Sequence, residues 1–282
     1  RARVIASRMP NTHLLVRLAL ALCVALPGPS IAAQSPAATP ANTDSSRLTL
    51  ERIFNSNEFA SHGVHGVRWS ADGAHYTMLE RSATASDESD LVRYDAATGK
   101  RDVLVAAARL MSPSDSAAIG IEDYQFSPDG KRLLIFTNSR RVWRQYTRGD
   151  YWVMDVAAGA PRKLGGAEAG SDSLMFAKFS PDGDRVAFVR GNNLYVENVA
   201  TGAVTPLTTD GSRTIINGTF DWVYEEELSL RDGFRWSPDG KHIAYWQLDD
   251  SGVRDFLLLD DTDSLYSYTI PVQYPKAGTT NS

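Results

Sequence analysis

The sequence is almost free of cysteine. Its single cysteine, Cys23, lies in an apolar run near the N-terminus. A chain with one cysteine has no internal disulfide, so the fold must depend on an ordinary hydrophobic core. The length of 282 residues and the 43% of hydrophobic residues are sufficient for such a core. Leu22 precedes the cysteine where a lipidation signal has a small residue, which argues against a lipid anchor.

The sequence also lacks an excess of positive charge and a long hydrophobic run. Its 29 basic and 34 acidic residues give a net charge of −5 with no basic stripe, so we expect no nucleic acid partner. The apolar run from Leu18 to Leu26 is too short to span a membrane. It follows Arg17 and precedes a break at Pro27 and small residues, a pattern typical of a secretory signal peptide.

These features predict that residues 1–33 are upstream residues plus a signal peptide. Residues 34–46, QSPAATPANTDSS, read as a linker. A buried N-terminal helix is the competing interpretation, but the segment has no amphipathic period. We therefore expect a periplasmic or secreted protein with no membrane partner. The absence of disulfides suits a bacterial envelope protein.

Catalytic and cofactor motifs are absent too. There is no Gly-x-Ser-x-Gly nucleophile elbow, no phosphate-binding loop and no cofactor motif. The histidines have neither metal-ligand spacing nor a partner pattern; they are His13, His62, His65, His75 and His242. We expect no cofactor, no metal and no catalytic residue within this chain.

What the sequence does contain is a repeat. RWSADG, QFSPDG, KFSPDG and RWSPDG end at Gly73, Gly130, Gly183 and Gly240. Ser-Pro-Asp-Gly is typical of a type I turn, because proline fixes φ at the second position and glycine suits the fourth. Runs such as RLLIFT and RVAFVR follow these turns and have the length and composition of β-strands.

A second turn signal with a glycine at its end follows in three copies, at Gly99, Gly159 and Gly202. Each repeat then holds about four short antiparallel strands in roughly 55 residues, which is typical of a β-propeller blade. A solenoid is the alternative, although its repeats are usually shorter. We predict an all-β fold with about four blades over residues 47–282. No closing strand is evident, so we expect a fragment of a longer protein, poorly soluble or partly unfolded when isolated.

One stretch differs from the repeats: DWVYEEELSL, from Asp221 to Leu230. Three consecutive glutamates can be a solvated acidic face or a site for a cation. Neighbouring residues in a strand point to opposite faces, whereas in a helix they lie about 100° apart, which long side chains can bridge. A cation site therefore requires a short helix, for which Asp221 is a plausible N-cap.

This stretch, the downstream RWSPDG turn and the segment VQYPKAG from Val272 to Gly278 closely resemble the dipeptidyl peptidase IV family of serine exopeptidases. The resemblance implies the first half of an eight-bladed propeller, with the α/β-hydrolase domain and its Ser/Asp/His triad absent from this chain. It assigns the substrate's N-terminal ammonium to Glu226 and Glu227. VWRQYTRGDYWVMD resembles the family's arginine segment and assigns the substrate's carbonyl to Arg144, with Arg140, Arg141 and Arg148 close by.

The resemblance thus implies the substrate-anchoring segment of an exported dipeptidyl aminopeptidase that releases X-Pro or X-Ala dipeptides. Its partners would be a peptide with a free N-terminus, a C-terminal hydrolase domain in cis and, through residues 249–274, a second copy of the chain. Those residues could equally be an ordinary pair of blade strands. Two other interpretations stay open: an inactive binding module of the same family, and an unrelated propeller that shares only the turns. The fragment by itself should be inactive.

Overall fold

A computed structural model describes residues 46–59, 66–85, 88–114, 116–263 and 265–282. The predicted signal peptide and all of the predicted linker except Ser46 lie outside these residues. The chain divides into two compact units, Arg1–His62 and Gly63–Ser282. Within the described part, no helix has both the length and the apolar character needed to cross a membrane.

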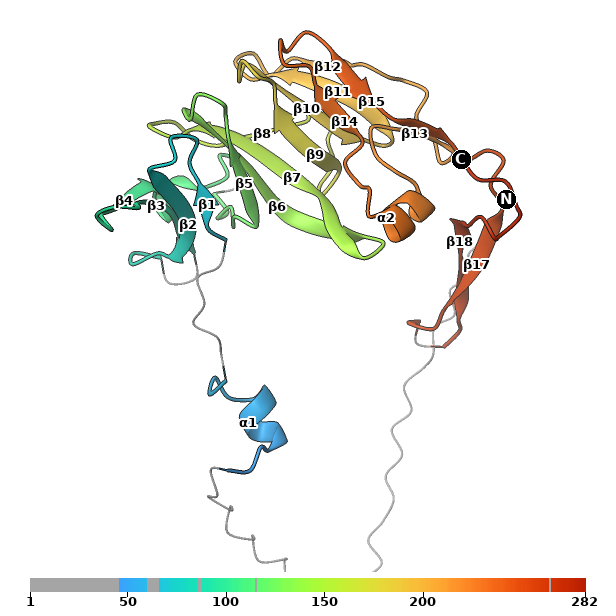
Figure 1. Ribbon diagram of the computed structural model, residues 1–282, viewed down its shortest axis with the longest axis horizontal. Helices are drawn as coiled ribbons and strands as arrows, with labels where there is room; N and C mark the ends of the chain where they lie inside the picture. Colours follow the sequence, from blue (N-terminus) through green and yellow to red (C-terminus); the bar gives the residue numbers. More distant parts are fainter. Residues whose placement is uncertain (1–45, 60–65, 86–87, 115, 264) are drawn as a thin grey trace, which may run out of the picture. The chain divides into compact units, whose positions relative to one another are not determined.

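The described part of the first unit contains one short helix, α1 (Leu50–Phe54). Thr49 caps its N-terminus, and the Thr49 side chain accepts a hydrogen bond from the backbone N–H of Arg52 at 3.2 Å. None of the helix residues is buried. The strands that the structure describes all belong to the second unit (Figure 1).

The first repeat forms a separate four-stranded antiparallel sheet with the strands in chain order. Its strands are β1 (Arg68–Trp69), β2 (His75–Arg81), β3 (Ser89–Asp95) and β4 (Arg101–Val105). A 3₁₀ helix, Ala107–Arg109, follows it. This up-and-down order is that of a propeller blade.

The second and third repeats each contribute four strands as predicted, but the two blades form one eight-stranded sheet. The second blade has β5 (Asp123–Phe126), β6 (Arg132–Val142), β7 (Gln145–Asp155) and β8 (Arg162–Lys163). The third has β9 (Leu174–Phe179), β10 (Arg185–Arg190), β11 (Asn193–Asn198) and β12 (Val204–Pro206). The blades join because β7 extends far enough to pair with β9 at Arg148↔Met175 and Gly149↔Leu174.

The fourth repeat is divided into two pairs of short strands. These are β13 (Ile215–Asn217) with β16 (Gln247–Asp249), and β14 (Phe234–Trp236) with β15 (Ile243–Tyr245). The single strand expected from HIAYWQ is interrupted at Trp246. The Trp246 N–H donates to Gly233 and its carbonyl accepts from Gly218, both at 2.9 Å, so its backbone pairs with the base of an inserted loop.

The insertion between Gly218 and Gly233 carries the helix α2 (Trp222–Leu228). After the fourth repeat, β17 (Asp255–Asp260) and β18 (Tyr268–Gln273) form a two-stranded hairpin of their own. Figure 1 shows this hairpin in red, set apart from the sheet of the second and third blades. The described strands give an all-β architecture of propeller blades, as the sequence predicts.

Burial on both faces explains why the blade strands have continuous apolar runs. Along β6, Leu133 and Ile135 pack into the core shared with the first blade, whereas Leu134 packs into the core shared with the third. Along β10, Phe188 faces the second blade and Val189 the fourth. Because alternate side chains in a strand point to opposite faces, a central blade needs apolar residues at every position.

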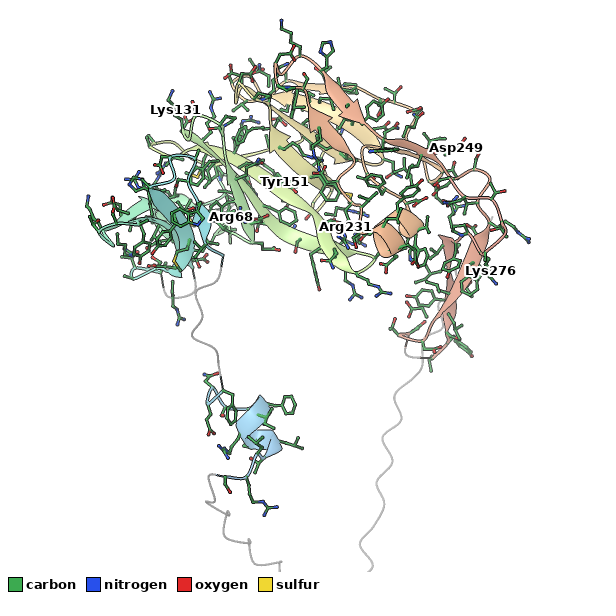
Figure 2. The ribbon with its side chains drawn as sticks, viewed as in Figure 1. Arg68, Lys131, Tyr151, Arg231, Asp249 and Lys276 are labelled. Carbon is green, nitrogen blue, oxygen red and sulfur yellow. The ribbon has the colours of Figure 1, made fainter. Side chains whose placement is uncertain are left out.

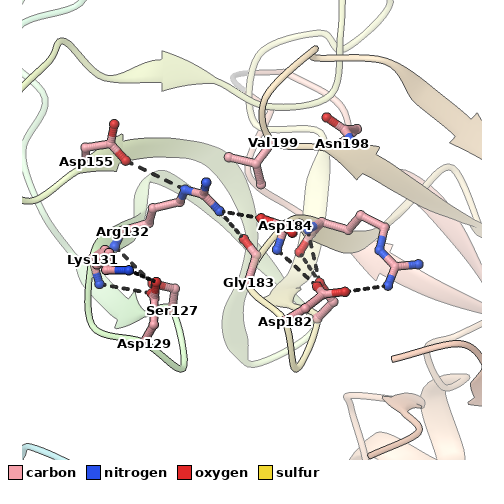
Figure 3. A network of polar contacts seen from close by, with 12 residues as sticks. Ser127, Asp129, Lys131, Arg132, Asp155, Asp182, Gly183, Asp184, Asn198 and Val199 are labelled. Atoms are coloured by element: carbon pink, nitrogen blue, oxygen red, sulfur yellow. Dashed lines mark hydrogen bonds and ion pairs between the residues drawn. The ribbon is translucent and has the colours of Figure 1, made fainter. Parts of the chain in front are cut away.

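Arginines after the Ser-Pro-Asp-Gly turns connect neighbouring blades (Figure 3). Arg132 donates to the carbonyl of Gly183 in the next turn at 2.7 Å and contacts Asp184 at 3.1 Å. Arg185 repeats this one blade later by donating to the carbonyl of Gly240 at 2.9 Å. In the second and third repeats, the arginine that follows the turn therefore fixes the distance to the next turn.

The turn aspartates give a stability prediction. Asp182 accepts hydrogen bonds from the Ser180 hydroxyl, the Asp184 N–H and Arg185. Asp182→Ala should lower the free energy of unfolding by about 1 kcal/mol, since the carboxylate is half exposed. Led by the Ser180 hydroxyl, these contacts depress the pKa of Asp182 to about 2. The stabilisation is therefore present above about pH 4 and lost as the pH falls toward 2.

Urea titrations at pH 7 and pH 2.5 measure this difference. The variant should have a lower free energy of unfolding than the wild type at pH 7, and this difference should be clearly smaller at pH 2.5. Asp261→Ala, at an exposed position in the hairpin loop, serves as a control and should change neither value. An equal loss for Asp182→Ala at both pH values contradicts the assignment.

Candidate functional site

The helix α2 forms where the sequence predicts a short helix. Asp221 is its N-cap with extended backbone angles, and the Asp221 carboxylate accepts the Tyr224 N–H at 2.9 Å. The helix ends at Ser229, whose φ of 57° places it in the left-handed region. The base of the loop is closed by the hydrogen bond from the Gly233 N–H to the Gly218 carbonyl at 3.0 Å. The predicted cap is confirmed.

Glycine is required at this base. A Cβ at Gly233 would lie 2.9 Å from the carbonyl carbon of Gly218, closer than real Cβ atoms approach other atoms. A Cβ at Gly218, where φ is 76°, would lie 2.9 Å from the Val189 side chain. The two glycines therefore let the two backbone segments meet and project α2 from the fourth blade.

The three glutamates of α2 have three different environments. Glu225 is 4% exposed, and the Arg231 Nε donates to its carboxylate at 3.3 Å. The Glu226 side chain is 8% exposed and forms an ion pair with Arg144. Glu227 is exposed. Because consecutive helical residues point about 100° apart, only part of the acidic run can face any one direction.

Arg144 comes from a different blade. It occupies the two-residue turn that joins β6 to β7, where Val142 pairs with Gln145. Figure 1 shows the tip of this long green hairpin beside α2. The Nε of Arg144 lies 2.6 Å from Oε2 of Glu226, while the Arg144 side chain remains 79% exposed. The guanidinium thus holds Glu226 and keeps most of its surface accessible.

Of the arginines that cluster near this turn, Arg144 is the one that pairs with Glu226 among the described residues. The Arg140 guanidinium instead lies 3.8 Å from the Asp172 carboxylate, and the backbone of Arg148 in β7 pairs with Met175 in β9. The structure therefore brings together two of the three predicted site residues, Arg144 and Glu226. The third, Glu227, is adjacent to them in the chain on the exposed side of the helix.

Trp143 supports the position of Arg144 with an unusual backbone. Its φ is 51°, a region that residues with large side chains rarely adopt. Such a conformation persists only where the surroundings determine it, and it is concentrated at functional sites. Here the two-residue turn imposes it, and the turn directs Arg144 toward α2.

A cavity of about 250 Å³ lies next to α2. Its lining combines residues from the hairpin tip, from α2 and from the segments next to them. It includes Trp143, Arg148, Trp222, Glu225, Arg231 and Asp250. Figure 2 places Arg231 between α2 and the β6–β7 hairpin. Burial raises the pKa of Glu225, and the Arg231 guanidinium opposes that rise. The ion pair with Arg231 therefore favours the charged form of a carboxylate that burial disfavours.

No group of three or more His, Cys, Asp or Glu side chains in the described residues has the arrangement of a metal site. The chemistry available at the site is that of carboxylates and guanidinium groups, which suits a ligand with a cationic head and a hydrogen-bond acceptor nearby.

Sequence reasoning missed two residues of this site, Glu225 and Arg231, because three consecutive glutamates cannot be told apart without knowing the direction of the helix. The arginine six residues after Glu225 was the available signal. A short helix followed by a return of the chain can place such an arginine against the buried acid.

Comparison with known proteins gives consistent results. The sequence model described as "Dipeptidyl peptidase IV (DPP IV) N-terminal region" matches residues 127–282. The chain is 31% identical over 276 residues to a probable dipeptidyl-aminopeptidase B of Chaetomium globosum, covering 89% of this chain and 30% of that protein. It is 36% identical over 166 residues to dipeptidyl aminopeptidase B of Saccharomyces cerevisiae, and the match covers 57% of this chain and 20% of that protein.

Among solved structures, Porphyromonas gingivalis dipeptidyl peptidase 4 superimposes with a TM-score of 0.71 at 32% sequence identity. The match covers 83% of this chain and 32% of the other. The chain therefore spans about a third or less of the length of these relatives.

The buried ion pair under α2 gives a stability prediction. Arg231→Leu leaves Glu225 buried without a partner and should lower the free energy of unfolding by about 2 kcal/mol, given that Arg231 is partly exposed. Because burial raises the Glu225 pKa, a protonated Glu225 tolerates the loss better, so the defect should be smaller at pH 4 than at pH 7.

Chemical denaturation at the two pH values measures this effect. Arg235→Leu is the matched control, because Arg235 is 66% exposed and its pair with Asp232 should contribute less than about 1 kcal/mol. Adding Glu225→Gln to Arg231→Leu should recover most of the loss. The assignment is wrong if the two arginine variants are equally destabilised.

Proposed function

The chain belongs to the dipeptidyl peptidase IV family, and we propose on that premise that it supplies the substrate anchor of an exported serine dipeptidyl aminopeptidase. In this proposal Glu226 and Glu227 bind the free N-terminal ammonium of a peptide, and Arg144 donates to a backbone carbonyl of the same peptide. The observation that carries the proposal is the ion pair between Arg144 and Glu226.

The chemistry suits an ammonium ligand. An ammonium has three donors and one positive charge. Carboxylate acceptors give it charge-assisted hydrogen bonds, which are shorter and stronger than neutral ones. Glu226 is nearly buried, so its bond to the ammonium is little weakened by water, and Glu227 offers an accessible second acceptor.

Arg144 has two roles in this proposal. Its Nε contacts Glu226 and keeps that carboxylate in place, while its exposed N–H groups are available to a carbonyl oxygen. A lysine could not do both, because its ammonium is a point charge without the planar fork. One side chain from the second blade thus sets the distance between ammonium and carbonyl.

The anchor also measures the substrate. A peptide that continues beyond the ammonium position has no charge there and meets two acids instead, so it binds poorly. Binding that starts at the amino end fixes which peptide bond reaches a catalytic group. This is the geometry needed to release dipeptides, for which the resemblance implies Pro or Ala at the second position.

We propose that the catalytic residues lie outside this sequence. The nucleophile elbow is absent from the 282 residues, and the chain covers about a third or less of its relatives. We propose that a C-terminal α/β-hydrolase domain supplies the Ser/Asp/His triad, and that the signal peptide at residues 1–33 directs the protein to the periplasm or outside. Loss of that triad would make the protein an inactive peptide-binding module instead.

We propose further that the β17–β18 hairpin joins two copies of the full-length protein. The hairpin pairs with no other described strand. Its apolar side chains are exposed at Phe256, Leu257, Leu258, Leu259, Tyr268 and Ile270. The pairing of the two strands puts Leu257 and Leu259 on one face of the hairpin and the other four side chains on the opposite face. Exposed apolar side chains gathered on one element are typical of a protein interface.

The anchor is tested on the full-length protein with a chromogenic dipeptide substrate. Glu226→Gln should lower kcat/KM about 30-fold or more, equivalent to about 2 kcal/mol for a charged hydrogen bond left half-made. N-acetylation of the substrate should remove most activity toward the wild type. Acetylation should have a smaller further effect in Glu226→Gln, because one of the two carboxylates that bind the ammonium has already been removed.

Glu168→Gln is the matched control, because it neutralises a glutamate that is 88% exposed on another loop. It should retain wild-type kcat/KM. Equal turnover of free and acetylated substrates by the wild type would refute the anchor, and no turnover of either would favour the inactive module.

The hairpin is tested by changing one of its faces. Leu257 and Leu259 lie two residues apart on β17, so they share a face, and they are 59% and 66% exposed. The double variant Leu257→Glu/Leu259→Glu should sediment as a monomer at concentrations where the wild type is a dimer. Leu207→Glu, exposed elsewhere, should stay dimeric. A dimer that survives the double variant contradicts this interface.

A further inference from the structure

Two buried carboxyl groups line the same cavity at the start of α2. Asp221 is 7% exposed and is the N-cap of the helix. Asp250, which directly follows β16, is 2% exposed. Burying two carboxylates beside one cavity is unfavourable, both because each loses its hydration and because like charges repel. The arrangement is therefore stable only if one of the two groups is neutral.

The hydrogen-bond partners of the two groups differ. The Asp221 carboxylate accepts the Tyr224 N–H at 2.9 Å and the Ser282 hydroxyl at 2.7 Å. It also lies at the positive end of the helix dipole, which favours negative charge. Asp250 Oδ1 has no hydrogen-bond donor among the described residues, although it is buried. Asp221 is stabilised as an anion and Asp250 is not.

The charged groups around Asp250 do not neutralise it. Arg213 opposes the rise in the Asp250 pKa, but it is 60% exposed and pairs with Asp255 at 2.9 Å. Asp249, on the strand before Asp250, adds a further repulsion. On the neighbouring elements, the charged side chains that line the same cavity are Arg148, Glu225 and Arg231, and Arg231 is paired with Glu225.

We propose that Asp250 is a positioning residue for the substrate anchor: it keeps a proton and donates it to the Asp221 carboxylate, so that the two acids share one proton at the N-cap of α2. No bond other than this hydrogen bond forms or breaks. The proposal rests on the function proposed above, since its effect is exerted through Glu226. It adds a residue that contacts neither the peptide nor Arg144.

The titration of Asp250 agrees with this arrangement. Burial first, and then the neighbouring Asp221 carboxylate, raise the pKa of Asp250 to about 7. An acid whose pKa is raised by folding stabilises the protein fully below its unfolded pKa of about 4 and loses that contribution as the pH rises to about 7. Ionisation above pH 7 then places two negative charges at the cap.

The cap is coupled to the anchor through the first turn of the helix. Asp221 holds the Tyr224 N–H through its side chain and the Glu225 N–H through its carbonyl at 3.1 Å. Glu226 is the next residue and must stay within reach of Arg144. If the cap loosens when Asp250 ionises, apparent affinity for the peptide falls in proportion to the fraction still protonated.

The test compares KM of the full-length wild type and Asp250→Asn between pH 6 and pH 8.5. The Asn amide donates to Asp221 at every pH, so this variant imitates the protonated acid. The ratio of wild-type KM to variant KM should be near 1 at pH 6 and rise up to about tenfold at pH 8. Deprotonation of the substrate's own amine affects both proteins equally and cancels in the ratio.

Two further variants keep the test decisive. Asp250→Ala provides no donor and should have a raised KM even at pH 6. Asp184→Asn removes the same charge at an exposed position on another blade, and its KM should follow the wild type at every pH. The melting temperature gives a readout that is independent of substrate. The melting temperature of Asp250→Asn minus that of the wild type should increase as the pH rises from 4 to 7 and stay constant above pH 7.

The results separate this proposal from the proposed function. A flat KM ratio and a pH-independent difference in melting temperature overturn the shared proton. If Glu226→Gln still raises KM in that case, the anchor stands without it. If Glu226→Gln leaves KM unchanged while the melting temperatures behave as expected, the shared proton exists but the anchor is wrong, and Asp250 has no role in positioning it.

Discussion

The contact between Arg144 and Glu226 is the interaction on which the account depends. The two residues come from the second and the fourth blade, and each is held in position by an unusual backbone conformation. A two-residue turn with a positive φ at Trp143 presents the arginine, and a loop closed by two glycines presents the glutamate. Their ion pair spans 2.6 Å and joins a nearly buried carboxylate to an exposed guanidinium. An anion fixed in this way, with a donor beside it, can bind an ammonium and an adjacent carbonyl together.

The blades hold these two residues at a constant separation. Strands β6 and β10 are buried on both faces, so side chains of the second and third blades pack into hydrophobic cores together with side chains of the neighbouring blades. Arg132 attaches the second turn to the carbonyl of Gly183 in the third, and Arg185 attaches the third turn to the carbonyl of Gly240 in the fourth. The pairing of β7 with β9 makes one sheet of the two central blades. A rigid support of this kind is what a site built from distant segments needs, because an error of about 1 Å weakens binding and catalysis severely.

Much of the fold can be predicted from the sequence because the responsible signals are local. The four Asp-Gly turns, the strands between them and the Asp221 cap depend on residues that lie close together in the chain. The interruption at Trp246 and the union of the second and third blades could not be predicted, since both depend on backbone groups from distant segments. The same limit applies to the site. The identity of Arg144 and Glu226 followed from a resemblance, but Glu225, Arg231 and Asp250 differ from other acids and bases in the sequence only through burial. The substrate-binding roles of Arg144, Glu226 and Glu227, and the role of the segment before residue 46, stay predictions.

The most direct measurement is a crystal structure of the full-length protein with a bound dipeptide at a pH where its amine is protonated. The account predicts that the ammonium nitrogen lies within about 3 Å of carboxylate oxygens of Glu226 and Glu227, with Arg144 donating to the peptide carbonyl and still contacting Glu226. A dipeptide bound with its ammonium away from both glutamates, while Arg144 and Glu226 remain paired only with each other, would contradict it.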